Sequence, residues 1–250
     1  MKTAIIIGAT SGIGRELATR LASDGWVVGT AGRRADRLEE LAAQFPEGTI
    51  LTQVIDITSA DATAALDALI EKTGAPDLFL HVSGIGKQNP ALDESIETRT
   101  METNCTGMTR MVTHFINYVK ASGYYSGSRK AHIGVISSVA GTAGLGSAPA
   151  YSASKRMQQT YISALVQMTR MYRIPVTFSD IRPGFVATDL LNPNKKYPMT
   201  ISVDKAARCI LRGLKRRKRI ICFDWRYRIL VFFWKLIPRC IWERFTFVKN

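Results

Sequence analysis

Short apolar runs alternate along the chain with longer segments whose apolar residues recur at helical spacing. The short runs are nearly continuous in Val, Ile, Leu and Phe, which is typical of parallel strands covered on both faces. They predict strands at Thr3–Gly8, Trp26–Thr30, Thr49–Val54, Leu78–Val82, Ala131–Ser137, Val176–Asp180 and Arg219–Phe223. The alternation with helical segments predicts an α/β fold with a doubly wound, parallel seven-stranded sheet.

The segments of helical period lie between these strands. They predict helices at Ile13–Ser23, Ala35–Phe45, Ala60–Lys72, Ser95–Lys120, Ala150–Tyr172 and Val203–Leu214. The polar, glycine-bearing segment Gly123–Lys130 is predicted to be an exposed loop. Neither a Pro/Ser-rich linker nor an internal repeat divides the chain. We therefore predict one domain over residues 1–223 and a C-terminal extension over residues 224–250.

The composition is close to that of an average globular protein. With 250 residues, of which 46% are hydrophobic and 22% charged, the chain is neither disordered nor a disulfide-rich miniprotein. The four cysteines are far apart and form no C-x-x-C pair, which predicts free thiols in a reducing compartment and no metal site. The run Ala4–Ile7 is too short for a signal peptide, and the chain lacks an apolar window long enough for a transmembrane helix. We predict a cytoplasmic protein.

The net charge of +14 is unevenly distributed. Residues 1–200 carry 20 Lys and Arg against 17 Asp and Glu, whereas residues 201–250 carry 14 against 3. The extension mixes aromatic side chains with cations, and Pro238 is expected to divide it into two short helices. Three interpretations stay open: peripheral contact with a membrane surface, a cap over a substrate pocket or dimer face, and nucleic-acid binding. Because no nucleic-acid motif accompanies the charge, we predict no nucleic-acid partner.

A glycine-rich turn, Gly8-Ala9-Thr10-Ser11-Gly12-Ile13-Gly14, joins the first predicted strand to the first predicted helix. Glycines let the backbone approach a ligand closely, and the free N–H groups and dipole of a helix N-terminus favour a pyrophosphate. The strand–turn–helix context favours nucleotide binding over a purely structural turn.

Tyr151 and Lys155 lie four residues apart at the start of a predicted helix, so their side chains share one face. A free tyrosine has a pKa of about 10, but a neighbouring ammonium favours the phenolate and should lower the pKa of Tyr151. Ser138 ends the fifth predicted strand, at the edge where open α/β sheets bind ligands. Its hydroxyl can donate a hydrogen bond to a reacting carbonyl oxygen, and we favour it over Ser137 for that role.

Together these motifs resemble those of the short-chain dehydrogenase/reductase family. The G-x-x-x-G-x-G turn is similar to the family's cofactor loop, and Ser138, Tyr151 and Lys155 are similar to its catalytic trio in order and spacing. Five motifs agree over residues 3 to about 223. The resemblance implies a Rossmann fold, a nicotinamide cofactor and reversible hydride transfer between that cofactor and a carbonyl or alcohol. Within this mechanism Tyr151 donates the proton and Lys155 also bonds the nicotinamide ribose. The positive nicotinamide ring should lower the pKa of Tyr151 together with Lys155.

The resemblance also implies roles for residues outside the trio. Asn104, in an N-x-x-G setting, would bend its helix and hold a water that continues the proton relay. The segment Pro183-Gly184-Phe185-Val186-Ala187-Thr188 resembles the family's P-G-x-x-x-T loop. Its backbone from Gly184 to Val186 and the Thr188 hydroxyl would orient the nicotinamide carboxamide.

Two arginines, Arg33 and Arg34, follow the second predicted strand, where an NAD site usually places an acid for the ribose 2′-OH. A guanidinium matches a 2′-phosphate in bidentate fashion, so we predict NADP(H), with NAD(H) as the alternative. Asp36 is the competing acid, but we interpret it as a helix cap. Asp56 closes the third strand; the resemblance places it beside the adenine, and an N-cap for the helix near Ala60 is an equal alternative.

The chain departs from the family at His81-Val82-Ser83-Gly84, where N-N-A-G is usual. We interpret His81 as a neutral hydrogen-bonding group or a satisfied interior histidine, because no carboxylate lies close in sequence to orient it for catalysis. Ser83 and Gly84 still permit close approach to the cofactor.

We therefore predict an NADP(H)-dependent oxidoreductase that acts on an apolar or lipid-like carbonyl or alcohol, as a homodimer or homotetramer. A non-catalytic NADP(H)-binding sensor or scaffold is the alternative. The predicted catalytic residues are Asn104, Ser138, Tyr151 and Lys155. The predicted cofactor-binding residues are Gly8, Thr10, Ser11, Gly12, Ile13, Gly14, Arg33, Arg34, Asp56, Ser83, Gly84, Tyr151, Lys155, Pro183, Gly184, Val186 and Thr188.

Overall fold

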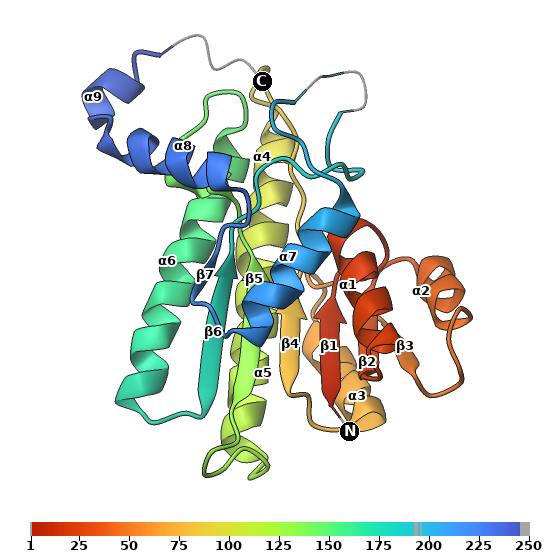
Figure 1. The fold of residues 1–250 in the computed structure, drawn as a ribbon. Coiled ribbons are helices and arrows are strands. Elements are labelled where there is room, and N and C mark those ends of the chain that lie inside the picture. The colour runs from red at the N-terminus through yellow and green to blue at the C-terminus, as the bar shows by residue number, and fades with distance from the viewer. Residues whose placement is uncertain (1, 193–194, 196, 246–250) are drawn as a thin grey trace.

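Seven parallel strands form one twisted sheet in the order β3-β2-β1-β4-β5-β6-β7 (Figure 1). The computed structural model describes residues 2–192, 195 and 197–245. The strands are β1 (Thr3–Ile7), β2 (Val27–Gly32), β3 (Ile50–Val54), β4 (Leu78–His81), β5 (Ala131–Ile136), β6 (Val176–Ile181) and β7 (Ile220–Ile221). Each predicted strand is present, with its ends displaced by at most two residues. The doubly wound α/β fold predicted from the sequence is thereby confirmed.

Helices cover both faces of the sheet and bury its apolar strands. On one face lie α1 (Gly12–Ser23), α2 (Ala35–Ala42) and α7 (Val203–Lys215), which bury residues such as Leu17, Leu38 and Ile210. On the other face lie α3 (Ala62–Thr73), α5 (Met108–Ala121) and α6 (Pro149–Met171), where the rings of Phe79 and Phe115 stack at 4.5 Å. Burial on both faces is the physical reason for the continuous apolar runs in the strands.

The helix predicted over Ser95–Lys120 is interrupted. It consists of α4 (Glu94–Met101), a π-helical turn η1 (Glu102–Gly107) and α5. Such turns insert one extra residue into a helix and occur frequently at functional sites. Asn104 lies within this turn, so the expected bend at Asn104 is present as a π-turn. The short 3-10 helix η2 (Val139–Thr142), which follows β5, was also not predicted from the sequence.

The C-terminal extension forms two helices, as predicted: α8 (Trp225–Leu236) and α9 (Arg239–Trp242), with Pro238 between them. Both lie beyond the carboxyl ends of the strands, above α6 in Figure 1. The last five residues of the predicted extension, 246–250, lie outside the described residues. None of the helices in the described part of the chain combines the length and hydropathy that a membrane span requires.

The basic residues of the last fifth of the chain do not form one surface. Because β7 runs parallel to β6, the run Lys215–Arg219 precedes its amino end, whereas α8 follows its carboxyl end. The cations in the described part of the extension therefore lie at the opposite edge of the sheet from that run.

The loop Gly123–Lys130 connects α5 to β5, as predicted, but it is not wholly exposed. Tyr125 is buried and its hydroxyl donates to the Pro76 carbonyl at 2.8 Å. The expectation of an exposed loop was therefore wrong for this side chain, because the ring finds an apolar site against Tyr118.

Candidate active site

The glycine-rich turn packs too tightly for side chains at two of its glycines. Gly8 has a φ of +98°, and a Cβ there would lie 2.6 Å from the Ser83 nitrogen. At Gly14 a Cβ would lie 2.0 Å from the Gly8 carbonyl oxygen. The backbone at the end of β1 can therefore approach a bound group closely, which a turn bearing side chains could not do.

The N-terminus of α1 has free donors and no competing acid. Ser11 is its N-cap residue, yet its side chain accepts no hydrogen bond from the helix, and the first turn holds no acidic residue. Ser11 instead accepts from Arg34, whose guanidinium donates to Thr10 Oγ1 at 2.7 Å and to Ser11 Oγ at 2.8 Å. Backbone N–H groups, a helix dipole and a guanidinium thus converge at one place, which suits a phosphate group.

The acidic residues near this turn do not act as the caps that the sequence suggested. Asp36 lies in the first turn of α2, whose N-cap residue is Arg34, and its carboxylate faces Arg37 at 3.9 Å. Asp56 accepts from the Thr58 nitrogen and hydroxyl, whereas α3 begins after Asp61. The cap interpretations of Asp36 and Asp56 were therefore wrong, because local turn geometry satisfies Asp56 before the helix begins.

Asp56 lies near Arg33 and has a lowered pKa. Hydrogen bonds from Thr58 hold its pKa below the usual value, and the Arg33 charge acts in the same direction. Arg33 and Arg34 are both exposed at the carboxyl end of β2. The structure thus brings the predicted arginines and Asp56 to the same edge as the glycine turn.

Ser138, Tyr151 and Lys155 meet at the carboxyl end of β5. Ser138 directly precedes η2, accepting from the Ala140 nitrogen at 3.1 Å, and it is buried. Lys155 lies one turn after Tyr151 in α6, with Nζ 5.7 Å from the Tyr151 ring centre. Ser137 instead donates to Asp180 Oδ1 at 2.5 Å, and the same carboxylate forms an ion pair with Arg182. The structure brings the predicted trio together and holds Ser137 elsewhere.

Burial affects the ionisation of both Tyr151 and Lys155. Tyr151 as a residue is partly exposed, but burial of its phenol raises the pKa, and the hydrogen bond with the Ser138 hydroxyl only partly opposes this. Burial also lowers the pKa of Lys155 to about 8. The desolvation of the phenol therefore opposes the effect expected from the ammonium and the nicotinamide ring, and the lowering of the Tyr151 pKa by these two charges stays a prediction.

Lys155 is held by two acceptors. Its Nζ donates to the Ile136 carbonyl at 3.0 Å and to Gln158 Oε1 at 3.1 Å. Gln158 Nε2 donates in turn to the main-chain carbonyl of Asn104 at 2.8 Å. Gln158 is fully buried and links the lysine to the π-turn. Sequence reasoning missed this residue; its position three residues after Lys155, on the same helix face, was the available signal.

The side chain of Asn104 ties the π-turn to the loop after β4. Its Oδ1 accepts from the Ile85 nitrogen at 2.8 Å, and its Nδ2 donates to the Ile85 carbonyl at 2.7 Å and to Ser154 Oγ at 3.0 Å. A Cβ on Gly84 would lie 3.2 Å from Asn104 Oδ1 and 3.4 Å from Lys155 Nζ. Gly84 therefore lies at the junction of the two predicted catalytic residues.

His81 is fully buried at the end of β4. Among the described residues neither ring nitrogen has a partner with hydrogen-bond geometry, although the Ser83 backbone is close enough to oppose the shift of the pKa slightly. Burial, reinforced by the Lys155 charge, lowers the pKa of His81 to about 3. The ring is neutral, as expected, but the expected hydrogen bonds are missing among the described residues, because the end of β4 buries both ring nitrogens without a partner beside them.

The loop after β6 closes over the glycine turn. A Cβ on Gly12 would lie 3.1 Å from Thr188 Cγ2, so Thr188 packs against the turn. Val186 pairs with Ile201 in an isolated bridge, and Ile13 packs on this pair. The Pro183 carbonyl accepts from the Val139 nitrogen at 3.0 Å and from the Ser138 hydroxyl at 3.5 Å.

A residue of the extension completes this loop. Tyr227 of α8 is buried, and its ring lies 2.0 Å from where a Gly184 Cβ would be. Its hydroxyl accepts from the Phe185 nitrogen at 3.2 Å and donates to the Pro198 carbonyl at 3.0 Å. Tyr227 therefore joins the extension to the loop that follows β6. Sequence reasoning did not single out Tyr227, since nothing local indicates a contact 43 residues away.

Comparisons with known proteins agree with this geometry. The family model for short chain dehydrogenase matches residues 2–198. An uncharacterized oxidoreductase of Myxococcus xanthus is 30% identical over 248 residues, covering 97% of this chain and 95% of the relative. A short chain dehydrogenase/reductase from Burkholderia phymatum, solved in complex with NAD, has a TM-score of 0.77 at 22% identity and covers 92% of this chain and 91% of its own. An alcohol dehydrogenase from the archaeon Thermococcus sibiricus, complexed with 5-hydroxy-NADP, has a TM-score of 0.73 at 25% identity, with coverages of 89% and 94%.

A parallel sheet with a nucleotide cradle beside a serine, tyrosine and lysine defines an oxidoreductase that acts on alcohol or carbonyl groups with a nicotinamide cofactor. The chain belongs to the short-chain dehydrogenase/reductase family, so the resemblance seen in the sequence is confirmed.

Proposed function

We propose that the protein is an NADP(H)-dependent reductase or dehydrogenase of an apolar, lipid-like carbonyl or alcohol. The observation that carries this proposal is the convergence of Ser138, Tyr151 and Lys155 beside the glycine turn, over which Thr188 closes. The cofactor supplies or accepts the hydride when it is bound.

The residues of the chain handle the proton and the oxygen. Ser138 donates a hydrogen bond to the carbonyl oxygen and stabilises the negative charge that develops there. Tyr151 donates the proton to this oxygen from its phenol form, which burial favours over the phenolate. Lys155 binds the ribose, and Asn104 supports the path by which Tyr151 regains its proton.

The cradle fits a dinucleotide, since Gly8 and Gly14 leave no room for side chains and the N-terminus of α1 has free donors. The pyrophosphate would rest on the turn from Gly8 to Gly14, with Thr10 and Ser11 beside it. Arg33 and Arg34 would hold a 2′-phosphate, which an exposed pair of guanidiniums suits better than a 2′-OH. Asp56 would flank the adenine, Ser83 and Gly84 the nicotinamide half, and the Pro183–Thr188 loop the carboxamide.

The proposal also includes the predictions on assembly and location. We expect a homodimer or homotetramer in the cytoplasm, in peripheral contact with a membrane surface through residues 224–250. Light scattering would give two or four times the chain mass of 27.7 kDa. A monomer at all concentrations would contradict the predicted oligomer. The apolar substrate is inferred from the aromatic helix α8 beside the site.

Replacement of the phenol tests the reaction. Tyr151→Phe should lower kcat by about a hundredfold or more, as expected for loss of a positioned acid, while the Kd for NADPH changes little. Steady-state NADPH oxidation with a panel of ketones measures kcat, and fluorescence titration measures the Kd for NADPH. Substantial turnover by the variant would refute the role of Tyr151. NADPH binding without turnover in the unmodified protein would instead support a sensor or scaffold.

A further inference from the structure

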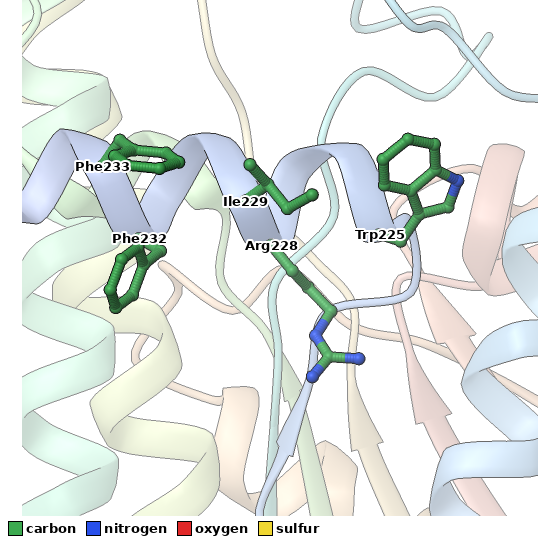
Figure 2. A pocket seen from close by; sticks show the side chains of 5 residues that line it. All are labelled: Trp225, Arg228, Ile229, Phe232 and Phe233. Carbon is green, nitrogen blue, oxygen red and sulfur yellow. The ribbon is translucent and has the colours of Figure 1, made fainter.

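The helix α8 turns an apolar face to solvent. Trp225, Ile229, Phe232 and Leu236 recur at spacings of four and three residues, so they share one face. Trp225 is 68% exposed, Phe232 60% and Leu236 63%. An open hollow of about 420 Å³ lies on this surface of the helix (Figure 2), and it is lined by Trp225, Arg228, Ile229, Phe232 and Phe233. A monomeric soluble surface rarely carries so many exposed large apolar side chains together, so this face indicates a binding surface.

The opposite face of α8 holds the helix in place. Tyr227 is buried against Gly184 and hydrogen-bonds both ends of the loop after β6. In α9 the Trp242 indole donates to the Gly144 carbonyl at 2.8 Å, next to η2. The exposed face is thus presented by a helix pair that is anchored at two points to the active-site edge of the sheet.

Cations flank the apolar face. Arg228 and Lys235 lie seven residues apart, two helical turns, and therefore on the same flank of α8. In Figure 2, Arg228 and Phe232 point to the same side of the helix. Two other cations of this segment are neutralised, Arg226 by Asp224 and Arg239 by Glu243. No carboxylate among the described residues pairs with Arg228 or Lys235, so these two are available to an anionic partner.

We propose that α8 and α9 dock onto an anionic lipid surface, with Trp225, Phe232, Phe233 and Leu236 entering the interface and Arg228 and Lys235 contacting the headgroups. Aromatic residues prefer this depth, and long cationic side chains can extend from it to the headgroups. Docking would place the carboxyl edge of the sheet, where Ser138 and Tyr151 lie, next to the lipid. An apolar carbonyl substrate would then enter the site from the lipid. This inference deepens the membrane contact proposed above but does not depend on the redox chemistry.

Lipid fits this face better than a second copy of the chain. A two-fold interface pairs identical patches, and α8 contains no Asp or Glu, so α8 of a second copy would offer no carboxylate to Arg228 and Lys235. An anionic bilayer offers negative charge beside an apolar interior, which matches the order of cations and aromatic rings across α8.

Vesicle co-sedimentation of the full-length protein tests the proposal. The probes are vesicles of phosphatidylcholine alone and of phosphatidylcholine with phosphatidylserine. The unmodified protein should bind the second kind more tightly, and added salt should weaken this binding. Phe232→Ser/Phe233→Ser should reduce the partition coefficient by about tenfold or more, because two exposed rings no longer enter the interface. Arg228→Glu/Lys235→Glu keeps the rings and should remove the preference for phosphatidylserine.

A matched control lies at the other end of the molecule. Met171 and Tyr172, 68% and 69% exposed, end α6, whose 23 residues place them roughly 35 Å from its start near α8. Met171→Ser/Tyr172→Ser should bind vesicles like the unmodified protein. Absence of binding to phosphatidylserine vesicles, or equal binding by all variants, would overturn the proposal. A change of oligomeric mass in the α8 variants, measured by light scattering without vesicles, would instead assign this face to a contact between copies and also overturn it.

Discussion

Arg34 lies beside the glycine turn, where the proposed function places the 2′-phosphate of NADP(H). Its guanidinium donates to Thr10 and Ser11, so the side chain is already turned toward the glycine turn. A guanidinium binds a 2′-phosphate through charge-assisted hydrogen bonds, which are stronger than the hydrogen bond that it can donate to a neutral 2′-OH.

Arg34→Ala should therefore raise the KM for NADPH roughly ten- to hundredfold, the range expected for one charge-assisted hydrogen-bonding group, and change the KM for NADH much less. The control is Arg37→Ala, on the same helix, whose guanidinium pairs with Glu40. Kinetics with both cofactors measure the ratio. An equal increase of the KM for NADPH and for NADH would show that Arg34 has only a structural role.

His81 makes the stability of the protein depend on pH. Its pKa is about 3 in the folded chain and about 6.5 in an unfolded one. Below pH 6.5 the unfolded chain therefore binds a proton that the folded chain does not, so stability falls as the pH falls.

His81→Asn should remove this contribution. Between pH 7 and pH 5 the unmodified protein should lose about 2 kcal/mol more stability than the variant, at ~1.4 kcal/mol per pKa unit. Urea unfolding at both pH values measures the difference. From pH 7 to pH 8 the free energies of unfolding of the two proteins should change in parallel, because the His81 ring is largely neutral in both the folded and the unfolded chain. Equal losses on acidification would show that the folded protein accommodates a charged His81.

At the scale of elements, α8 and the loop after β6 form one unit. The ring of Tyr227 occupies the space that a side chain at residue 184 would need, and its hydroxyl joins Phe185 to Pro198. Removal of the whole extension would therefore disturb the site, and point changes separate the contributions better.

Tyr227→Phe should destabilise the protein by about 1–2 kcal/mol, since it leaves the Phe185 nitrogen and the Pro198 carbonyl without their partner, and should raise the KM for substrate. Gly184→Ala should cost about 1–3 kcal/mol through overpacking. Thermal unfolding and steady-state kinetics measure both variants. Tyr172→Phe, at an exposed ring, is the control and should change neither quantity. A Tyr227→Phe variant with unaltered stability and KM would show that the ring alone fixes the loop.

At the scale of the whole molecule, burial is deepest in the central strands and least in the extension. The side chains of Ala4–Ile7 in β1, Phe79 and Leu80 in β4 and Ile133 in β5 have no exposed surface, whereas most of α9 is exposed. Amide protons exchange most slowly where opening requires global unfolding.

Hydrogen exchange followed by mass spectrometry should therefore show the slowest exchange in β1, β4 and β5 and the fastest in α9. The protection of α8 should be intermediate, because only its inner face is packed. Protection of α9 equal to that of β1 would mean that the extension is integrated with the core far more firmly than its exposure indicates.

The local pattern of the sequence was sufficient for the order of strands and helices, for the glycine turn and for the Tyr151–Lys155 pair. Each of these depends on residues within a few positions of one another, where periodicity and spacing act directly. The family motifs extended this to Ser138, Asn104 and Thr188, and the structure brings these residues to one edge of the sheet.

Only the tertiary structure decided the contacts between distant segments. Gln158 reaches Asn104 across 54 positions, and Tyr227 settles on Gly184. The same packing buried the Tyr151 phenol, which raises its pKa, and left both ring nitrogens of His81 without a hydrogen-bond partner among the described residues. The physical reason is that burial and long-range contact depend on how whole elements pack, whereas helical and strand periods are set by neighbours along the chain.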